Sequence, residues 1–165
     1  MAKIFIADDE ADIRRLLTYV LADEGHEVRV APDGREAIET MIMEPPEVLI
    51  LDLMMPFMDG MAVLREMQDY QTLDSTKVLV LTAKGSEFDR HLAFDLGADC
   101  YLTKPFEADA VAEMVATMLE LSKEELKVRR EQERDTAHLL SQLESIFEDG
   151  TKVAGQIDLD ERSGE

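Results

Sequence analysis

Five side chains of this sequence have the types and the spacing needed to handle a phosphoryl group. Asp8 and Asp9 directly follow a short apolar run, and Asp52 follows a second run of the same kind. Thr82 ends a third apolar run, and Lys104 stands just after a fourth. If these runs are neighbouring parallel strands, their carboxyl ends bring the carboxylates, the hydroxyl and the ammonium group to one edge.

Carboxylates that converge at one edge repel each other, so their pKa values rise unless a cation compensates the charge. A cluster of oxygen ligands without His or Cys suits Mg²⁺, whose remaining ligands are waters. A lysine and a hydroxyl beside such a metal can neutralise and bind phosphoryl oxygens. Asp52, alone at the end of its run, is the candidate nucleophile that would form an acyl phosphate.

Regular alternation of apolar runs with helical patterns predicts the fold that positions these groups. The run ending at Asp52 is apolar throughout and follows Pro46, as expected for a central strand buried on both faces. The pattern predicts an α/β fold, a five-stranded parallel doubly wound sheet with helices on both faces. The expected strands are 3–7, 27–31, 48–52, 77–81 and 100–102, and the expected helices are 12–24, 35–43, 61–70, 86–96 and 106 to about 120.

The motifs together resemble the receiver domain of two-component response regulators, of the chemotaxis-regulator type. The matching pieces are an acidic pair, a central aspartate followed by Leu-Met-Met-Pro, a Thr-Ala pair and a Tyr-Leu-Thr-Lys-Pro segment. They begin at Asp8, Asp52, Thr82 and Tyr101, in the family's order, within residues 1 to about 120. The resemblance implies the flavodoxin-like receiver fold and a phosphorylation-activated switch of a phosphorelay.

The resemblance also implies a role for each matching residue. Asp52 would accept a phosphoryl group from a histidine kinase or a phosphotransfer protein. Asp8, Asp9, Asp52 and the backbone carbonyl of Met54 would hold Mg²⁺. Lys104 would pair with the phosphoryl oxygens.

In the same family, phosphorylation is relayed to partner proteins by a threonine and an aromatic residue. Thr82 would move toward the phosphoryl group and Tyr101 would rotate inward, which shifts the face formed by the fourth helix, fifth strand and fifth helix. A cis peptide bond is expected before Pro105. Met54 and Lys84 occupy the positions that flank the path of the hydrolytic water. Taken alone, a threonine after a strand or a half-buried tyrosine more often has a purely structural role, and this holds for Thr82 and Tyr101.

Composition and charge restrict where such a chain works and what it binds. The 165 residues are 45% hydrophobic and 33% charged, and the net charge is -20. This charge gives no general attraction for nucleic acid or an anionic membrane surface. No segment has the length of a membrane span or the pattern of a secretory signal peptide. One cysteine, Cys100, fits a reducing, cytoplasmic compartment.

Three segments are expected: a receiver domain over 1–120, a helical extension over 121–149 and a flexible tail over 150–165. The fifth helix should continue past residue 120, with Gly150 breaking it. Leu119, Leu126, Leu140 and Phe147 share a seven-residue register that Glu133 interrupts. Two interpretations of the extension stay open: a solvated helix packed on its own domain, or a contact for a homodimer or another partner.

Several functions compete with the phosphorylated switch. The receiver fold could serve as a phosphorylation-independent interaction module, but the intact acid, threonine and lysine set argues against it. A Mg²⁺-dependent phosphatase would need a second acid two residues after the nucleophile, where this chain has Met54. We therefore expect a switch that catalyses only its own phosphorylation and dephosphorylation, not a turnover enzyme. The chain could be a complete regulator or a receiver and linker from a longer one, and its output protein is not specified.

Overall fold

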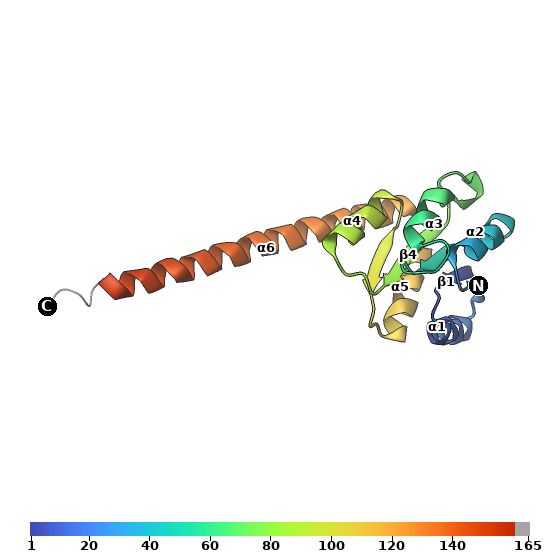
Figure 1. Cartoon of the computed structure of the whole chain (residues 1–165), viewed down its shortest axis with the longest axis horizontal. Helices are drawn as coiled ribbons and strands as arrows, with labels where there is room; N and C mark the ends of the chain where they lie inside the picture. Colours follow the sequence, from blue (N-terminus) through green and yellow to red (C-terminus); the bar gives the residue numbers. More distant parts are fainter. Residues whose placement is uncertain (161–165) are drawn as a thin grey trace. The chain divides into compact units, whose positions relative to one another are not determined.

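The structure is a computed structural model that describes the backbone of residues 1–160 and the side chains of residues 1–147 (Figure 1). Five strands form one parallel sheet in the order β2-β1-β3-β4-β5. The strands are β1 (Lys3–Ala7), β2 (Glu27–Ala31), β3 (Val48–Leu51), β4 (Lys77–Thr82) and β5 (Cys100–Thr103). The helices are α1 (Ala11–Asp23), α2 (Gly34–Met43), α3 (Gly60–Met67), a short 3-10 turn η1 (Gln71–Leu73), α4 (Glu87–Asp95), α5 (Ala108–Glu120) and α6 (Lys123–Asp160).

Alternating side chains of the strands divide the core into two apolar layers, one on each face of the sheet. One layer joins Phe5, Leu49 and Val80 to α2, α3 and α4, and the other joins Ile6 and Ile50 to α1 and α5. Figure 1 shows the same division, with α1 and α5 on the opposite side of the sheet from α2, α3 and α4. The predicted doubly wound parallel sheet is confirmed.

Local sequence signals determine where several helices begin. Asp33, Asp59 and Ser86 precede α2, α3 and α4, and the side chain of each accepts a hydrogen bond from a backbone N–H of the first turn. Gly25 and Gly97 follow α1 and α4 with φ values of 91° and 107°, a conformation that glycine adopts without a steric penalty. The residues next to each of these helices therefore determine where it begins or ends.

The junction after α5 differs from the expected continuous helix. Leu121 has an extended backbone (φ -96°, ψ 144°), so α5 ends at Glu120 and α6 is a separate helix. Ser122 and Glu125 form a capping box, because the Glu125 N–H donates to Ser122 Oγ (3.1 Å) and the Ser122 N–H donates to Glu125 Oε2 (2.7 Å). This reciprocal cap starts a new helix where the prediction had one helix continuing.

The first turn of α6 belongs to the receiver unit. Leu126 is 2% exposed and lies in the same apolar layer as α1 and α5. Lys123 Nζ donates to the backbone carbonyls of Asp74 (3.2 Å) and Thr76 (2.7 Å), just before β4. The compact unit accordingly ends at Lys127, and a second unit begins at Val128. The structural boundary thus lies several residues beyond the predicted one at 120.

The predicted helix break at Gly150 is wrong, because α6 continues through this residue to Asp160. A single glycine inside a helix costs only about 1 kcal/mol relative to alanine, which does not by itself end a helix. The flexible tail over 150–165 stays a prediction: residues 150–160 have a helical backbone, and residues 161–165 lie outside the described residues.

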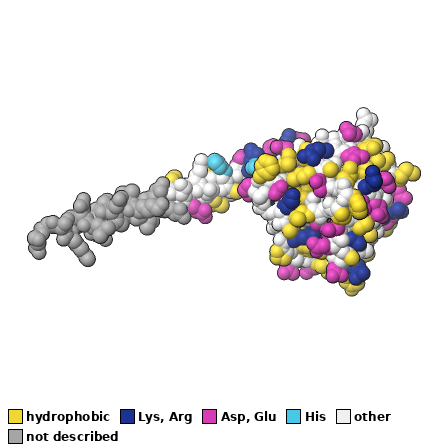
Figure 2. All heavy atoms as spheres, viewed as in Figure 1, with side chains coloured by type: hydrophobic (Ala, Val, Ile, Leu, Met, Phe, Trp, Pro, Cys, Tyr) yellow, Lys and Arg dark blue, Asp and Glu magenta, His cyan; other side chains and the backbone are white. Residues whose placement is uncertain are grey.

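The surface of the receiver unit mixes acidic, basic and hydrophobic side chains. On the face shown in Figure 2, Asp and Glu side chains lie among Lys, Arg and apolar ones, and the basic side chains are scattered. Among the described residues, none of the helices has the length and apolar character required to cross a bilayer.

Candidate functional site

The carboxyl ends of three strands of the sheet, β1, β3 and β5, bring the predicted carboxylates and lysine together. Asp8 directly follows β1, Asp52 follows β3 and Lys104 follows β5. Asp8 and Asp52 are only 2% and 3% exposed, although ionised carboxylates are rarely buried without partners. Their burial indicates that this edge of the sheet is a structured site in which both acids have polar partners.

Four carboxylates at this edge form a cluster that could hold a metal ion. Each of Asp8, Asp9, Glu10 and Asp52 offers one ligand oxygen, and these oxygens all lie within 4.8 Å of one another. Asp8 and Asp52 are buried, whereas Asp9 and Glu10 are exposed and leave the cluster open to solvent. A set of carboxylate oxygens without nitrogen or sulfur suits a hard divalent cation.

Lys104 bridges the two buried carboxylates. Its Nζ lies 2.9 Å from Asp8 Oδ2, 2.9 Å from Asp52 Oδ2 and 3.4 Å from Glu10 Oε1. Burial alone lowers the pKa of Lys104, but the hydrogen bonds to Asp8 and Asp52 outweigh it and raise the pKa above its ordinary value. Lys104 is therefore a permanent cation between two buried acids.

The remaining carboxylate oxygens accept backbone hydrogen bonds that hold both acids in place. Asp8 Oδ1 accepts from the Glu10 N–H (2.8 Å), and Asp52 Oδ1 accepts from the Met54 N–H (3.0 Å). Burial raises the pKa of Asp8, and the hydrogen bonds from Lys104 and the Glu10 N–H only partly offset this effect. Asp8 thus holds a proton to a higher pH than an ordinary aspartate does.

The loop after Asp52 is closed at its base by glycine. The Gly60 N–H donates to the Leu53 carbonyl (3.1 Å). A Cβ at Gly60 would lie 2.3 Å from the Asp52 carbonyl oxygen and 2.7 Å from the Leu53 Cα, so no other residue fits without moving the backbone. This close approach fixes the backbone that carries Asp52.

Thr82 and Tyr101 lie at the same edge of the sheet, and the hydrogen bonds of both go to Lys84. Thr82 is fully buried, and its Oγ accepts from the Lys84 N–H (3.3 Å). Tyr101 is 7% exposed, and its hydroxyl donates to the Lys84 carbonyl. Burial raises the pKa of Tyr101. The tyrosine also packs edge-on against Phe94 and under the Arg90 guanidinium, 5.6 Å from the ring centre.

The structure therefore places the predicted site residues in two groups. Asp8, Asp9, Asp52 and Lys104 form one cluster, whereas Thr82 and Tyr101 meet at the backbone of Lys84. The cis bond expected before Pro105 is confirmed.

Glu10 is the member of the cluster that the sequence analysis did not assign. It follows the acidic pair directly, and its carboxylate reaches both the cluster and Lys104. The run of three consecutive acids was the available signal. Spacing alone cannot identify the third as a member, because the chain turns into α1 at this point and decides which carboxylates face inward.

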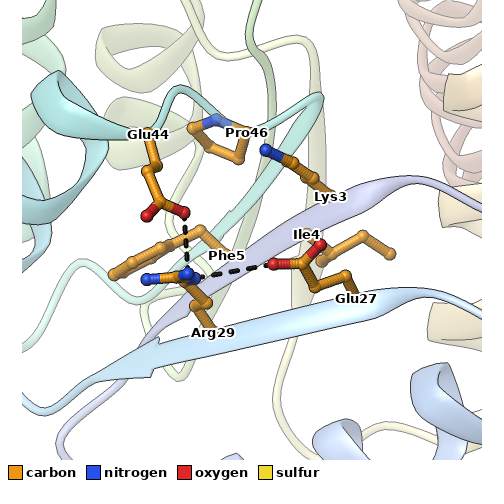
Figure 3. A pocket seen from close by; sticks show the side chains of 7 residues that line it. All are labelled: Lys3, Ile4, Phe5, Glu27, Arg29, Glu44 and Pro46. Carbon is orange, nitrogen blue, oxygen red and sulfur yellow. Dashed lines mark ion pairs between the residues drawn. The ribbon is translucent and has the colours of Figure 1, made fainter.

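The opposite edge of the sheet holds a small hollow that has its own internal partners. Arg29 lies between two acids in this hollow (Figure 3). Its Nη2 is 2.8 Å from Glu44 and its Nε is 3.7 Å from Glu27. Lys3 and Pro46 also line this hollow, at the amino ends of the strands. Arg29 is paired with both acids of this hollow, which lies at the edge opposite the carboxylate cluster.

Comparisons with known proteins agree with this architecture. Residues 4–116 match the family model of the response regulator receiver domain. The chain is 40% identical over 120 residues to the alkaline phosphatase synthesis transcriptional regulatory protein PhoP of Bacillus subtilis, covering 73% of this chain and 49% of that protein. The chain thus spans about half the length of this curated relative.

Solved structures with similar folds include proteins of the same kind. The chemotaxis protein CheY4 of Vibrio cholerae matches with a TM-score of 0.68 and 30% identity, covering 72% of this chain and 98% of that one. A putative response regulator from Chloroflexus aurantiacus matches with a TM-score of 0.68 and 31% identity, covering 73% of this chain and 98% of that one.

Proposed function

Because the chain belongs to the response regulator receiver family, a family of phosphorylation-activated switches, we propose that Asp52 is the carboxylate that accepts the phosphoryl group. The observation that carries this proposal is the position of Asp52, buried at the end of β3 and bridged by Lys104 to Asp8. A buried carboxylate held beside a permanent cation and an open acidic cluster is arranged to receive a dianionic group.

The acidic cluster supports Mg²⁺ as the cofactor. Asp8, Asp9 and Asp52 would hold the ion with the backbone carbonyl of Met54, and Glu10 lies close enough to act through a bound water. Bound Mg²⁺ neutralises charge that develops on phosphoryl oxygens. The excess of carboxylates over the single Lys104 cation supports this assignment, since four acids gathered around one ammonium group leave net negative charge.

The protein side chains then perform the transfer in a single displacement. One Asp52 carboxylate oxygen forms a bond to phosphorus while the bond from phosphorus to the donor histidine nitrogen breaks, and the imidazole keeps the electron pair. The Met54 N–H holds the other oxygen of Asp52, which orients the attacking one. Lys104 moves its hydrogen bond from Asp52 to a phosphoryl oxygen.

Phosphorylation would be transmitted through Thr82 and Tyr101. Both side chains contact the backbone of Lys84, so a movement of Thr82 toward a phosphoryl group changes the support of the Tyr101 hydroxyl. Tyr101 packs on α4 through Phe94 and Arg90, which couples it to the face made by α4, β5 and α5. Partner proteins would detect the change on this face.

The partners we propose are a histidine kinase or phosphotransfer protein as donor and an output protein reached by direct contact. Alpha-helix α6 adds a face for self-association, because Leu140, Leu143 and Phe147 lie exposed at coiled-coil spacing. We therefore propose a homodimer formed through α6. One cysteine and a kinase donor favour the cytoplasm, and the net charge of -20 argues against binding nucleic acid or an anionic membrane.

The receiver is a signalling domain, and we propose that it catalyses only its own phosphorylation and dephosphorylation. Two alternatives stay in view: a receiver and linker from a longer regulator, and a module that signals without phosphorylation. The short coverage of PhoP supports the first alternative, and the intact Asp8, Asp52 and Lys104 cluster argues against the second.

The test measures the intact mass of the chain after incubation with Mg²⁺ and a small acyl phosphate. We expect the wild type to gain one phosphoryl group, a gain that a chelator abolishes, and the Asp52→Asn variant to gain none. Asn preserves the shape of the side chain but removes the nucleophilic carboxylate. A matched control is Asp12→Asn, since Asp12 is an exposed acid in the first turn of α1 outside the cluster.

Equal labelling of wild type and Asp52→Asn would contradict the assignment of Asp52. Absence of labelling together with absence of Mg²⁺ binding by calorimetry would reject the phosphorylated switch and favour the phosphorylation-independent module.

A further inference from the structure

Phe57 is the most exposed aromatic side chain near the site, and its backbone is strained. Its side chain is 93% exposed, and its φ of 65° lies in the left-handed region. Bulky residues rarely adopt this conformation, because Cβ approaches the following carbonyl oxygen. Both the exposed ring and the strained backbone disfavour phenylalanine here on grounds of stability, which makes a functional reason for the residue worth seeking.

The loop that carries Phe57 is held in place on both sides of it. The Met58 N–H donates to the Pro56 carbonyl (2.7 Å), and the Met58 carbonyl accepts from the N–H of Gly34 at the start of α2 (3.2 Å). The loop is closed at its base by the hydrogen bond from Gly60 to Leu53 (3.1 Å). These bonds hold the backbone of the loop in place while the ring of Phe57 faces solvent. The loop therefore loses little conformational entropy when a partner binds the ring.

Phe57 stands in an apolar loop, defined here as Met54 to Met58, that begins two residues after Asp52. Met54 is 52% exposed, and Met55, Phe57 and Met58 add further apolar surface. Phe57 lies five positions after Asp52, a span of at most about 18 Å for an extended chain and less in a closed loop. The exposed ring is therefore carried by the loop that leaves the carboxyl end of β3 beside Asp52.

We propose that Phe57 is a docking residue for the protein that donates the phosphoryl group, with its ring entering an apolar pocket beside the donor's phosphohistidine. This inference rests on the proposed function of Asp52. The donor is a protein whose histidine is surrounded by apolar side chains, with Lys or Arg next to them to complement the exposed Asp9 and Glu10.

The position of Asp52 selects this occupant over others. Asp52 is 3% exposed, so a donor imidazole can reach its carboxylate only if the donor surface closes over the rim of the site. The apolar loop is continuous with Asp52 and must be covered in that complex. A small acyl phosphate can enter the same site without covering the loop. Its transfer rate therefore measures the chemical step without the docking of a donor protein.

The experiment compares two phosphoryl donors on the full chain. Each autophosphorylated histidine kinase of the source genome is first mixed with the wild type, and the kinase that transfers fastest serves as the protein probe. Acetyl phosphate serves as the small donor. For Phe57→Ala we expect the second-order rate of transfer from the kinase to fall about tenfold or more relative to the rate with acetyl phosphate, with recovery at saturating chain concentration.

Matched variants separate docking from folding. Met43→Ala removes another highly exposed apolar side chain (81%) at the end of α2, one residue before Glu44 of the hollow, and should leave both rates unchanged. Phe57→Asn places a residue that tolerates positive φ at the same position, and should lose transfer from the kinase as Phe57→Ala does. Circular dichroism and the melting temperature report folding of each variant.

Several outcomes would overturn the proposal. Unchanged transfer from the kinase in Phe57→Ala would exclude docking through this ring. An equal loss of the labelling rate with both donors would mean that Phe57 supports the structure of the site itself. Loss of self-association with an unchanged transfer rate would mean that the loop contacts a second copy of the chain. If acetyl phosphate labels the wild type but no kinase does, the docking proposal fails while the proposed function stands. If neither donor labels it, both fail.

Discussion

Lys104 is the residue on which the electrostatics of the site depend most directly. Its ammonium group contacts two carboxylates, Asp8 and Asp52, that are almost completely withdrawn from water. Removal of one partner from a buried charge network leaves the others uncompensated, which costs several kcal/mol. The same ammonium group opposes the binding of a second cation to the cluster, because like charges repel at short distance in a poorly solvated site.

Replacement of Lys104 by methionine tests both effects at once. In metal-free buffer we expect Lys104→Met to lower the free energy of unfolding by about 3 kcal/mol, measured by urea denaturation. The affinity for Mg²⁺, measured by calorimetry, should rise about tenfold while labelling by acyl phosphate slows. Lys3→Met is the control, since Lys3 is an exposed lysine at the amino end of β1, at the opposite edge of the sheet. Weaker Mg²⁺ binding in Lys104→Met would contradict the repulsion argument.

The raised pKa of Asp8 predicts the direction in which pH changes metal binding. Asp8 is an acid whose pKa lies above its ordinary value, so it becomes protonated earlier than other aspartates as the pH falls. A metal ion must displace that proton, and the affinity for Mg²⁺ should therefore decrease on acidification, beginning above the ordinary aspartate pKa of about 3.9. Calorimetric titrations at several pH values measure this dependence.

The Asp8→Asn variant provides the comparison for that pH series. It should bind Mg²⁺ more weakly and with a flatter dependence on pH, because the proton that competes with the metal is gone. An identical pH dependence in wild type and variant would show that another group controls the affinity.

At the scale of elements, the junction between α5 and α6 determines where the receiver unit ends. The Ser122–Glu125 capping box starts α6, Leu126 packs into the core, and Lys123 binds two carbonyls before β4. The first turn of α6 thus contributes buried apolar surface to the layer that also holds α1 and α5. A boundary drawn at residue 120 would omit this contribution.

Truncation of Leu126 measures how much the first turn of α6 stabilises the receiver. We expect Leu126→Ala to lower the free energy of unfolding by about 2–4 kcal/mol, because a fully buried leucine loses both transfer free energy and packing. Leu139→Ala makes the same chemical change at a residue that is 60% exposed on the same helix and should have a small effect. Equal effects of the two substitutions in urea denaturation would argue against α6 being part of the receiver core.

At the scale of the whole molecule, the chain consists of a receiver unit and a second unit that begins at Val128. Within the second unit, Leu140, Leu143 and Phe147 are each more than half exposed and follow the spacing of a coiled-coil seam. Glu133, seven residues before Leu140, is paired with Arg129 at 3.2 Å, so the apolar seam starts after it. A short seam of this kind supports at most a marginal dimer.

A charge placed in the seam tests the proposed homodimer. We expect the wild type to dimerise at micromolar concentrations and Leu143→Asp to remain monomeric, as measured by light scattering after size exclusion, because the dimer would bury an unpaired carboxylate. Ser141→Asp adds the same charge to the same helix outside the Leu140–Leu143–Phe147 seam and should leave the dimer intact. A monomeric wild type in both phosphorylation states would reject the proposed dimer.

Residue types and their order along the chain determined the fold and most of the carboxylate cluster. Apolar runs that end in Asp8, Asp52 and Thr82 could be recognised because parallel strands in a βα alternation share one functional edge. The confirmed five-stranded sheet follows from that alternation. The family resemblance added the cis bond before Pro105, which periodicity alone does not contain.

Only the tertiary structure decided which side chains meet and where helices stop. Membership of Glu10 depends on how the chain turns into α1. The anchoring of Lys123 and Leu126 depends on the segment before β4 and on the apolar layer that holds α1, both distant in sequence. The positive φ and the exposure of Phe57 could not be predicted from the neighbouring residues in the sequence, since a positive φ arises from hydrogen bonds that close the loop. The sequence determined what arises from local pattern, and the folded chain decided what requires contacts between distant segments.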